Sequence, residues 1–348
     1  MSTSSIETSA IPGEESPEDP SGARAHKAVV RRKVGLDRFA LLIAFAAVIV
    51  GFGVDEPSTF LTVGNLSNIL GSQAVLFALV LAVLLPTVMG DFDLSLGASA
   101  GLSAMTAAVL NVQHNVPVLV ACLAGVVVAC IVGFVNALFV VWYRNDPFIV
   151  TLGTMTVVTG IIYVVSGNNS IGVVSTSLSN WIFTNNLFSI PLEFYYGLGL
   201  FLIVWYTLSF TPIGQKALVV GQSREVARLT GVKVDKMRMW AFVFAAGIAG
   251  IAGMFYAGTN GTVDPTAGST YILPAYAAVF LGATAIRPGR INPLGAFIAV
   301  YFLATGAAGL ELLGAQTYVQ QIFYGAALVI AVTIPKVTRQ RIRRRLIQ

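Results

Sequence analysis

The chain has 348 residues, of which 56% are hydrophobic and only 11% are charged. This small number of charged groups cannot cover the surface of a soluble protein of this size. The composition therefore excludes a water-soluble globular protein and indicates that lipid is the main solvent. The formal net charge of +5 has two interpretations, a nucleic-acid surface or the Lys and Arg residues that keep loops in the cytoplasm, and the second is favoured.

The N-terminal region is rich in Ser, Thr, Glu, Pro and Gly and almost lacks aromatic residues. We therefore expect residues 1–35 to form a disordered cytoplasmic tail. No cleavage pattern of a secretory signal accompanies the first apolar run, so this run should remain as a membrane anchor.

Ten apolar segments are each compatible with a helix that crosses a bilayer, which needs about 20 residues. We expect them near residues 38–54, 68–89, 94–112, 116–142, 147–166, 191–210, 238–258, 269–286, 291–313 and 316–335. In this threading all 21 Lys and Arg residues fall in the termini, in alternate loops or at the first residue of a segment, and none lies further inside a segment. The pattern predicts an all-α, polytopic membrane protein of about ten helices, with both termini in the cytoplasm.

The predicted segments contain no titratable group at depth. The acids are expected at cytoplasmic helix ends (Asp91, Asp93, Asp146) and at external helix ends (Glu193, Asp264, Glu311). Ion-coupled carriers usually keep such groups inside the bundle, and the chain also lacks a P-loop that would cradle ATP phosphates. It should therefore be a passive channel or receive its driving force from another polypeptide.

The loop of residues 211–238, between the sixth and seventh segments, is the long cytoplasmic loop of the threading. Ser223 can cap a short helix and Gly231 can end it, which leaves residues 224–230 as about two turns. Such a helix could pass a push from a soluble partner into the bundle, or it could be a solvated loop that only carries charge. The spacing alone does not separate the two.

The faces of this short helix differ in chemistry. Val226 and Leu229 are three residues apart and share one face, while Arg224 and Arg228 share another. The stretch GQKALVVG, residues 214–221, precedes the helix. At this loop the chain resembles the permease subunits of bacterial ATP-binding-cassette importers for monosaccharides, the ribose, xylose and arabinose permeases. The resemblance covers about residues 36–336.

Further family landmarks occur in order along the chain. They are FLTVGNLSNIL at 60–70, GDFDLSLG at 90–97, PFIVTLGT at 147–154 and FLGAT at 280–284. Asp91 stands where the family usually has a second Gly. The motif residues that match are Gly90, Asp93, Leu94, Ser95 and Gly97. Asp93 or Asp91 can accept N–H bonds at the start of the third segment, and this capping role is favoured over direct contact with a solute.

The resemblance implies that one stretch forms the coupling helix, which sits in a groove of the ATPase. Its residues are Ser223, Arg224, Glu225, Val226, Ala227, Arg228, Leu229, Thr230 and Gly231. The neutral polar groups and the proline that could line a path for a hydroxyl-rich solute are Gln73, Asn136, Thr151, Thr154 and Pro274. For each polar one, bonding between helices is at least as good an interpretation.

The resemblance also implies the function and the partners. The chain would be the transmembrane subunit that imports a ribose- or xylose-like sugar across the bacterial inner membrane by ATPase-driven alternating access. It would not be an enzyme, and it would need no cofactor or metal. Its partners would be a cytoplasmic ATPase, an extracytoplasmic sugar-binding protein, membrane lipid and a second permease copy in a homodimer, with no nucleic acid.

Several alternatives stay open at this stage. The solute could instead be a nucleoside, inositol, an autoinducer furanone or a branched-chain amino acid, and a passive channel is the less favoured class. The permease domain would span residues 36–336, with an inverted repeat allowed by the segment order, and residues 337–348 would form a basic cytoplasmic tail. The external loop at 167–190 could dock a partner or rest at the lipid headgroups.

Overall fold

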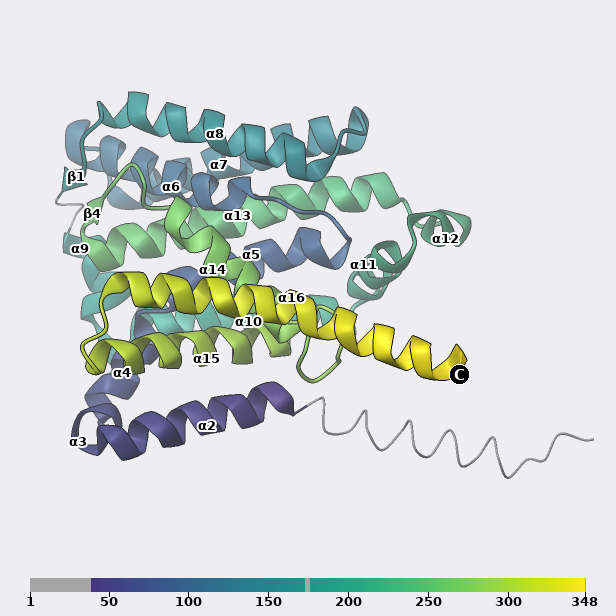
Figure 1. Cartoon of the computed structure of the whole chain (residues 1–348). Coiled ribbons are helices and arrows are strands. Elements are labelled where there is room, and N and C mark those ends of the chain that lie inside the picture. Colours follow the sequence, from purple (N-terminus) through teal and green to yellow (C-terminus); the bar gives the residue numbers. More distant parts are fainter. Residues whose placement is uncertain (1–38, 173–175, 348) are drawn as a thin grey trace, which may run out of the picture. The chain divides into compact units, whose positions relative to one another are not determined.

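The computed structural model describes residues 39–172 and 176–347, so the expected tail at 1–35 lies outside the described residues. These residues form helices, together with two short antiparallel ladders (Figure 1). One ladder pairs β1 (Ile171–Gly172) with β4 (Thr262–Val263), and the other pairs β2 (Asn186–Leu187) with β3 (Ile190–Pro191).

The helices follow the chain order of the predicted segments. They are α2 (Ala40–Asp55), α3 (Pro57–Phe60), α4 (Val63–Gly71), α5 (Ala74–Val88), α6 (Ser95–Ala108), α7 (Val118–Ala137), α8 (Pro147–Ser166), α9 (Thr176–Ser179), α10 (Leu192–Phe210), α11 (Pro212–Gln222), α12 (Arg224–Leu229), α13 (Val234–Asn260), α14 (Ser269–Gly282), α15 (Pro293–Leu312) and α16 (Thr317–Ile347). Three π-helical turns, η1 (Val109–Gln113), η2 (Leu138–Trp142) and η3 (Asn180–Thr184), extend α6, α7 and α9.

Seven helices within the described part of the chain are long and apolar enough to cross a membrane. They are Val63–Val88, Ser95–Gln113, Val118–Trp142, Pro147–Ser166, Leu192–Phe210, Val234–Asn260 and Pro293–Leu312. Shorter apolar helices, Ala40–Asp55, Ser269–Gly282 and Thr317–Thr333, occupy the other three expected positions. The chain is a helical, multi-pass membrane protein, and the total of ten crossings stays a prediction.

Local sequence explains where several helices start. Asp146 caps α8, because its side chain accepts hydrogen bonds from the N–H groups of Phe148 and Ile149. Pro147 follows at the first helical position, where a missing N–H costs nothing. Asn292 caps α15 in the same way by accepting from the N–H of Gly295.

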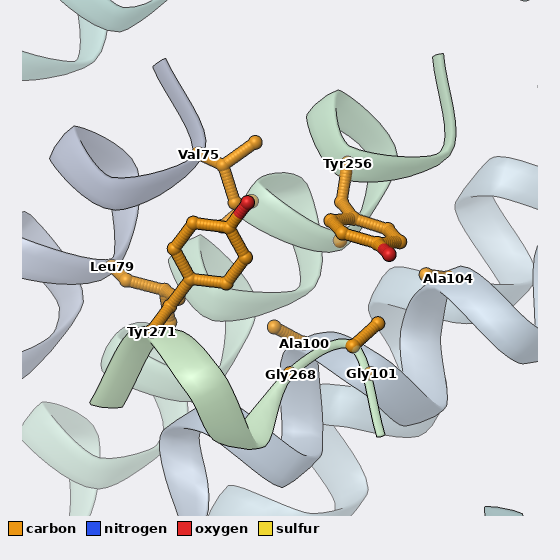
Figure 2. A pocket seen from close by; sticks show the side chains of 11 residues that line it. Val75, Leu79, Ala100, Gly101, Ala104, Tyr256, Gly268 and Tyr271 are labelled. Atoms are coloured by element: carbon orange, nitrogen blue, oxygen red, sulfur yellow. The ribbon is translucent and has the colours of Figure 1, made fainter. Parts of the chain in front are cut away.

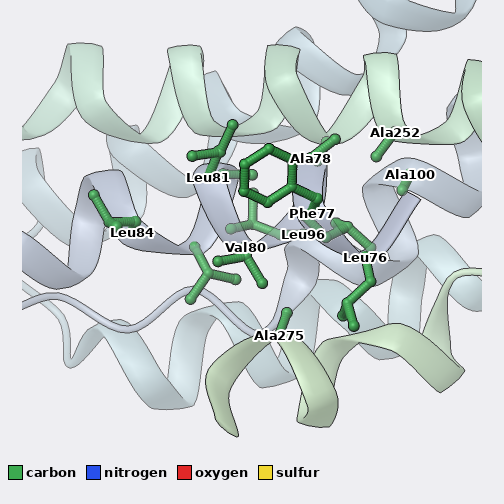
Figure 3. Close-up of a cluster of buried hydrophobic side chains, with 14 of the residues drawn as sticks. Leu76, Phe77, Ala78, Val80, Leu81, Leu84, Leu96, Ala100, Ala252 and Ala275 are labelled. Carbon is green, nitrogen blue, oxygen red and sulfur yellow. The ribbon is translucent and has the colours of Figure 1, made fainter. Parts of the chain in front are cut away.

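Helix α5 forms the centre of the packing (Figure 3). Every residue from 78 to 84 is fully buried, which is why this helix is apolar on all sides and has no polar face. It packs against α13, α14, α10 and α15. Helix α8, by contrast, has only 17% of its apolar window buried, against 78% for the span that contains α5.

Helix α6 crosses its neighbours at very short range because small residues line the contacts. A Cβ atom on Gly97 would lie 2.6 Å from the carbonyl oxygen of Gly268, just before α14. A Cβ atom on Gly253 of α13 would overlap the carbonyl oxygen of Ala100. Small residues allow such close backbone approach in lipid, so these glycines set how α6, α13 and α14 fit together.

Helix α16 continues to Ile347 and so includes the basic stretch expected as a separate tail at 337–348. Arg and Gln are good helix formers, and no glycine interrupts this stretch. The helix therefore extends beyond the apolar run that was expected to end near 335.

Candidate functional site

The short helix predicted at 224–230 is present as α12. The Ser223 hydroxyl accepts a hydrogen bond from the N–H of Val226 at 3.3 Å, and Gly231 adopts a φ of +80° just after the helix. The helix ends at Leu229, one residue earlier than expected. The Leu229 and Val226 side chains are exposed, so the predicted apolar face is free of contacts with the bundle.

The loop around α12 contains a second helix that was not predicted. The Thr211 side chain caps α11 by accepting from the N–H of Gly214, and Pro212 stands at the first helical position. This Thr-Pro start is the sequence signal that would have revealed it. Helices α11 and α12 lie together at one end of the bundle, and β1 and β4 lie at the other end (Figure 1).

Asp91 joins this loop to the bundle through two arginines. Its carboxylate accepts hydrogen bonds from Arg238 Nε and Nη2, both at 2.7 Å, and from Arg224 Nη2 at 2.8 Å. Asp91 and Arg238 are buried, whereas the Arg224 side chain is 38% exposed. A two-pronged bond between guanidinium and carboxylate is among the stronger polar contacts in proteins. We call these three residues the Asp91 cluster.

The Asp91 cluster corrects two expectations. Arg238 was placed at the edge of a segment free of cations, but α13 begins four residues earlier, at Val234, and includes Arg238 among its buried residues. Asp91 was expected at an exposed helix end or as a cap. It is buried because it neutralises Arg238, and a buried charge without a partner would be costly.

Asp93 lies two residues further on, in a second buried group. Its carboxylate Oδ1 accepts from the Ser95 N–H at 3.0 Å and from the Ser95 hydroxyl at 2.6 Å. Asp93 thus accepts an N–H bond at the start of α6, although the N-cap position itself is Leu94. The Asn136 side-chain amide donates to the Ser95 hydroxyl oxygen at 2.7 Å. Burial raises the pKa of the Asp93 carboxyl to about 6, although the bonds from Ser95 oppose the rise.

The backbone of the same segment is held from two further helices. The Asp93 N–H donates to the Tyr276 hydroxyl of α14 at 2.8 Å, and the Leu94 N–H donates to the Thr151 hydroxyl of α8 at 3.2 Å. We call the bonded set of Asp93, Ser95, Asn136, Thr151 and Tyr276 the Asp93 hub. It unites the start of α6 with α7, α8 and α14, so the segment 89–94 is held against the bundle with Asp91 and Asp93 buried, while Gly90 and Phe92 remain exposed.

A third buried acid lies in the first turn of α10. Glu193 is fully buried, and it accepts a hydrogen bond from the Thr259 hydroxyl of α13 at 2.6 Å. The expectation that titratable groups lie only at exposed helix ends is therefore wrong for Asp91, Asp93 and Glu193. The periodicity of apolar residues could not reveal this, because Asp91 and Glu193 are bonded to partners distant in the sequence and the Asp93 N–H is bonded to the distant Tyr276.

The structure brings together only part of the predicted solute path. Asn136 and Thr151 meet in the Asp93 hub, where both are bonded between helices. Gln73 lies at the start of α5 and donates to the Ser72 hydroxyl at 3.0 Å. Thr154 and Pro274 are half-buried. The alternative to a solute path, bonding between helices, therefore describes Asn136 and Thr151 in this conformation.

Two hollows lie along the helices toward the β4 end. The first is an apolar cavity of about 10 Å³ among α5, α6, α13 and the segment before α14, faced by Tyr256 and Tyr271 (Figure 2). A space this small holds about one water at most, so no sugar fits there in this conformation. The second measures about 350 Å³ and is lined by Gly64, Ser67, Asn68, Ser72, Thr184, Asn186 and Pro191. Sequence reasoning found neither, because each combines residues from distant elements.

The described residues contain no group of three or more His, Cys, Asp or Glu side chains that could hold a metal ion. The Asp91 cluster and the Asp93 hub are instead charge-neutralising and hydrogen-bonding arrangements that connect helices. Their arrangement is suited to holding helices in register rather than to bond breaking.

Comparison with known proteins gives a consistent result. The ribose import permease protein of Bacillus subtilis (strain 168) is 32% identical over 90% of this chain and 95% of its own length. The D-allose transport system permease protein of Escherichia coli (strain K12) is 28% identical over 86% and 92%, and the fructose import permease protein of Rhizobium meliloti is 27% identical over 86% and 85%. No solved structure matches.

These similarities confirm the resemblance to sugar-importer permeases that the motifs indicated, and they confirm a transport component rather than an enzyme. The family described as the permease component of the branched-chain amino acid transport system matches residues 65–332, which include both the Asp91 cluster and α12. The chain therefore belongs to this family of transport permeases.

Proposed function

We propose that the chain is the membrane subunit of a bacterial inner-membrane importer for a monosaccharide, with ribose as the first candidate. The observation that carries this proposal is the similarity to a ribose import permease over 90% of the chain. Relatives named for allose and fructose support the same class of solute. A branched-chain amino acid is the second candidate, because the family description names that solute.

The proposed energy source is a separate ATPase that docks on α12 and its flanking residues, 223–231. The exposed apolar side chains of Val226 and Leu229 support this docking, since a short rigid helix with free apolar groups suits insertion into a groove of a partner. In the proposed cycle, closure of the ATPase moves α12 and opens the bundle toward an extracytoplasmic sugar-binding protein. Hydrolysis then resets the bundle to face inward.

We propose ten crossings with both termini in the cytoplasm. The positions of α2, α14 and α16 support the count, because each is an apolar helix. The distribution of Lys and Arg supports the orientation, since it puts the α12 end of the bundle inside. An inverted repeat fits this order of segments.

The solute would pass between α5, α6, α13 and α14. The small cavity faced by Tyr256 and Tyr271 supports this route, because it lies where these four helices meet. Gln73, Thr154 and Pro274 would line the path in a more open conformation, and the bonds of Asn136 and Thr151 would rearrange there.

Reconstituted vesicles test the proposed function. The permease, the ATPase that co-purifies with it and its binding protein would be offered radiolabelled ribose, allose, fructose and leucine. We expect ATP-dependent accumulation of a sugar, with ribose preferred. Accumulation of leucine alone would favour the second candidate, and uptake without ATPase would contradict the proposal.

A pair of variants tests the docking site in the same vesicles. Val226→Asp with Leu229→Asp should abolish co-purification of the ATPase, because both charges would have to be desolvated in an apolar groove. Leu313→Asp is the matched control, since Leu313 is an exposed leucine that follows α15. Equal loss of ATPase binding in both variants would contradict docking on α12.

A further inference from the structure

The two arginines of the Asp91 cluster differ in position and in burial. Its two arginines come from different elements, Arg238 from α13 and Arg224 from the first position of α12. Arg238 is bidentate and buried, while Arg224 contributes one bond and remains partly exposed. The Arg238 side chain therefore holds Asp91 in the bundle, and the Arg224 side chain connects Asp91 to α12 at the surface.

Only one residue separates the Asp91 cluster from the Asp93 hub. That residue, Phe92, stacks on Tyr276 with ring centroids 6.0 Å apart, and its carbonyl oxygen accepts from the Thr151 hydroxyl at 3.4 Å. The backbone between Asp91 and Ser95 is thus bonded at successive residues. Because these successive residues are each bonded to the bundle, a displacement of the Asp91 backbone would act directly on the hydrogen bonds of the hub.

The other arginine of α12 offers a comparison within the same helix. Arg228 Nη2 lies 3.0 Å from Asp235 Oδ1, and both side chains are more than half exposed. An exposed pair of this kind contributes little, and its two residues belong to the same surface loop and the adjoining first turn of α13. Arg228 therefore does not reach the bundle interior, although it carries the same charge as Arg224.

We propose that Asp91 is the positioning residue that carries movement of α12, through Arg224, into the Asp93 hub and so to the inner ends of α6, α7, α8 and α14. This inference rests on the proposed function, since it assumes that a partner moves α12. In this arrangement Arg238 supplies the anchor and Arg224 supplies the connection. Loss of Arg224 should leave the fold intact and separate hydrolysis from transport, while the exposed side chains of Val226 and Leu229 still retain the ATPase.

The first experiment needs no partner. Hydrogen exchange of the backbone amides at residues 92–95 would be measured in the reconstituted permease and in its Arg224→Gln and Arg228→Gln variants. We expect faster exchange in Arg224→Gln only, because the Asp93 and Leu94 amides depend on the position of Asp91. Unchanged exchange in Arg224→Gln would overturn the connection, whatever the protein transports.

The second experiment measures coupling in vesicles that contain the ATPase and the binding protein. The ratio of sugar accumulated to ATP hydrolysed should fall about tenfold in Arg224→Gln, within the usual range for coupling between sites. Lys236→Gln should keep the ratio within about twofold, because Lys236 is an exposed cation of α13 that lies outside the proposed docking residues 223–231. Arg224→Lys should recover part of the ratio, since a single charged donor is enough for the Asp91 Oδ1 contact.

Asp91→Asn completes a double-mutant cycle. The variant with both Asp91→Asn and Arg224→Gln should be no less coupled than Asp91→Asn alone, because residues in one bonded chain are not additive. Additive losses would overturn the proposal, and so would loss of ATPase co-purification in Arg224→Gln, which would make Arg224 a direct partner contact. Failure of the wild-type protein to bind any ATPase would refute the proposed function. The hydrogen-exchange result would still decide whether Arg224 is connected to the hub, because that experiment uses no ATPase.

Discussion

Two aspartates only two residues apart have different environments in this protein. Asp91 is paired with two guanidinium groups, whereas the Asp93 carboxylate accepts from the neutral N–H and hydroxyl groups of Ser95. From the sequence, both were predicted to be acids at the start of the same helix. The difference arises because Arg238, on a distant helix, reaches one carboxylate and not the other.

The neutral surroundings of Asp93 give the protein a predictable dependence on pH. Burial raises the pKa of Asp93 in the folded state from 3.8 to about 6, so the folded state binds a proton more tightly than the unfolded state. Its contribution to stability is therefore full below the unfolded pKa and is lost as the pH rises through about 6. Asp93→Asn keeps the acceptor for Ser95 and removes the titration.

We expect the melting temperature of the wild type to fall more between about pH 5 and about pH 8 than that of Asp93→Asn. Thermal unfolding followed by fluorescence in nanodiscs would measure this difference. Asp264→Asn is the control, because hydrogen bonds from Thr266 and Ser170 hold the Asp264 pKa below 3.8, outside this window. A pH profile that is the same in Asp93→Asn and the wild type would refute the assignment.

At the scale of helices, close packing depends on a few glycines. Helix α6 lies against the segment before α14 through Gly97 and against α13 through Gly253. These contacts join the helices that surround the small cavity, so the same residues that make the closed conformation tight also border the proposed path. Other glycines, such as Gly199 on α10, face open space and carry no such constraint.

Gly253→Ala should therefore destabilise the bundle, by about 1–3 kcal/mol as for other overpacked cores. The added methyl group would overlap the backbone of α6 and force the helices apart. Gly199→Ala should have little effect or a slightly stabilising one, because alanine favours helix and nothing lies nearby. The midpoints of thermal unfolding of both variants in nanodiscs would be compared, and equal midpoints would show that α6 and α13 can separate freely.

At the scale of the whole molecule, α8 is the least covered of the seven long apolar helices in the described part of the chain. Its buried residues Thr151, Val158 and Ile162 lie on one face. Gly153 and Gly160 lie on the opposite face and have nothing within 4 Å of an added Cβ atom. Small residues on an uncovered apolar helix favour close packing of a second helix in lipid, so we propose that two permease copies meet along α8.

Disulfide cross-linking tests this assembly. In a background without Cys122 and Cys130, Gly160→Cys should give cross-linked dimers when membranes are oxidised, because a symmetric interface brings equivalent residues together. Val127→Cys on α7 is the control, since Val127 is also exposed but lies on a different helix. Equal cross-linking of the two variants, or none at Gly160→Cys, would contradict the proposed interface.

Sequence by itself determined the class of protein, the positions of the apolar helices and the short helix α12. These features depend on local signals, namely runs of apolar residues, Ser223 as a cap and Gly231 as a terminator. It did not determine which charges are buried. Arg238, Asp91 and Glu193 each lie near a helix end, where hydropathy permits either exposure or burial, and only the packing of distant helices decided between them.

The same reason explains the two connected groups beside α5. Asp93 and Ser95 are local partners, and the sequence indicated that Asp93 or Asp91 could accept an N–H bond there, but Asn136, Thr151 and Tyr276 come from three other helices. Their meeting depends on crossing distances set by Gly97, Gly253 and Gly268, which no periodic pattern encodes. Tertiary structure therefore decided how α12 is connected to the bundle, because a hydrogen bond between helices requires both helices to be in place.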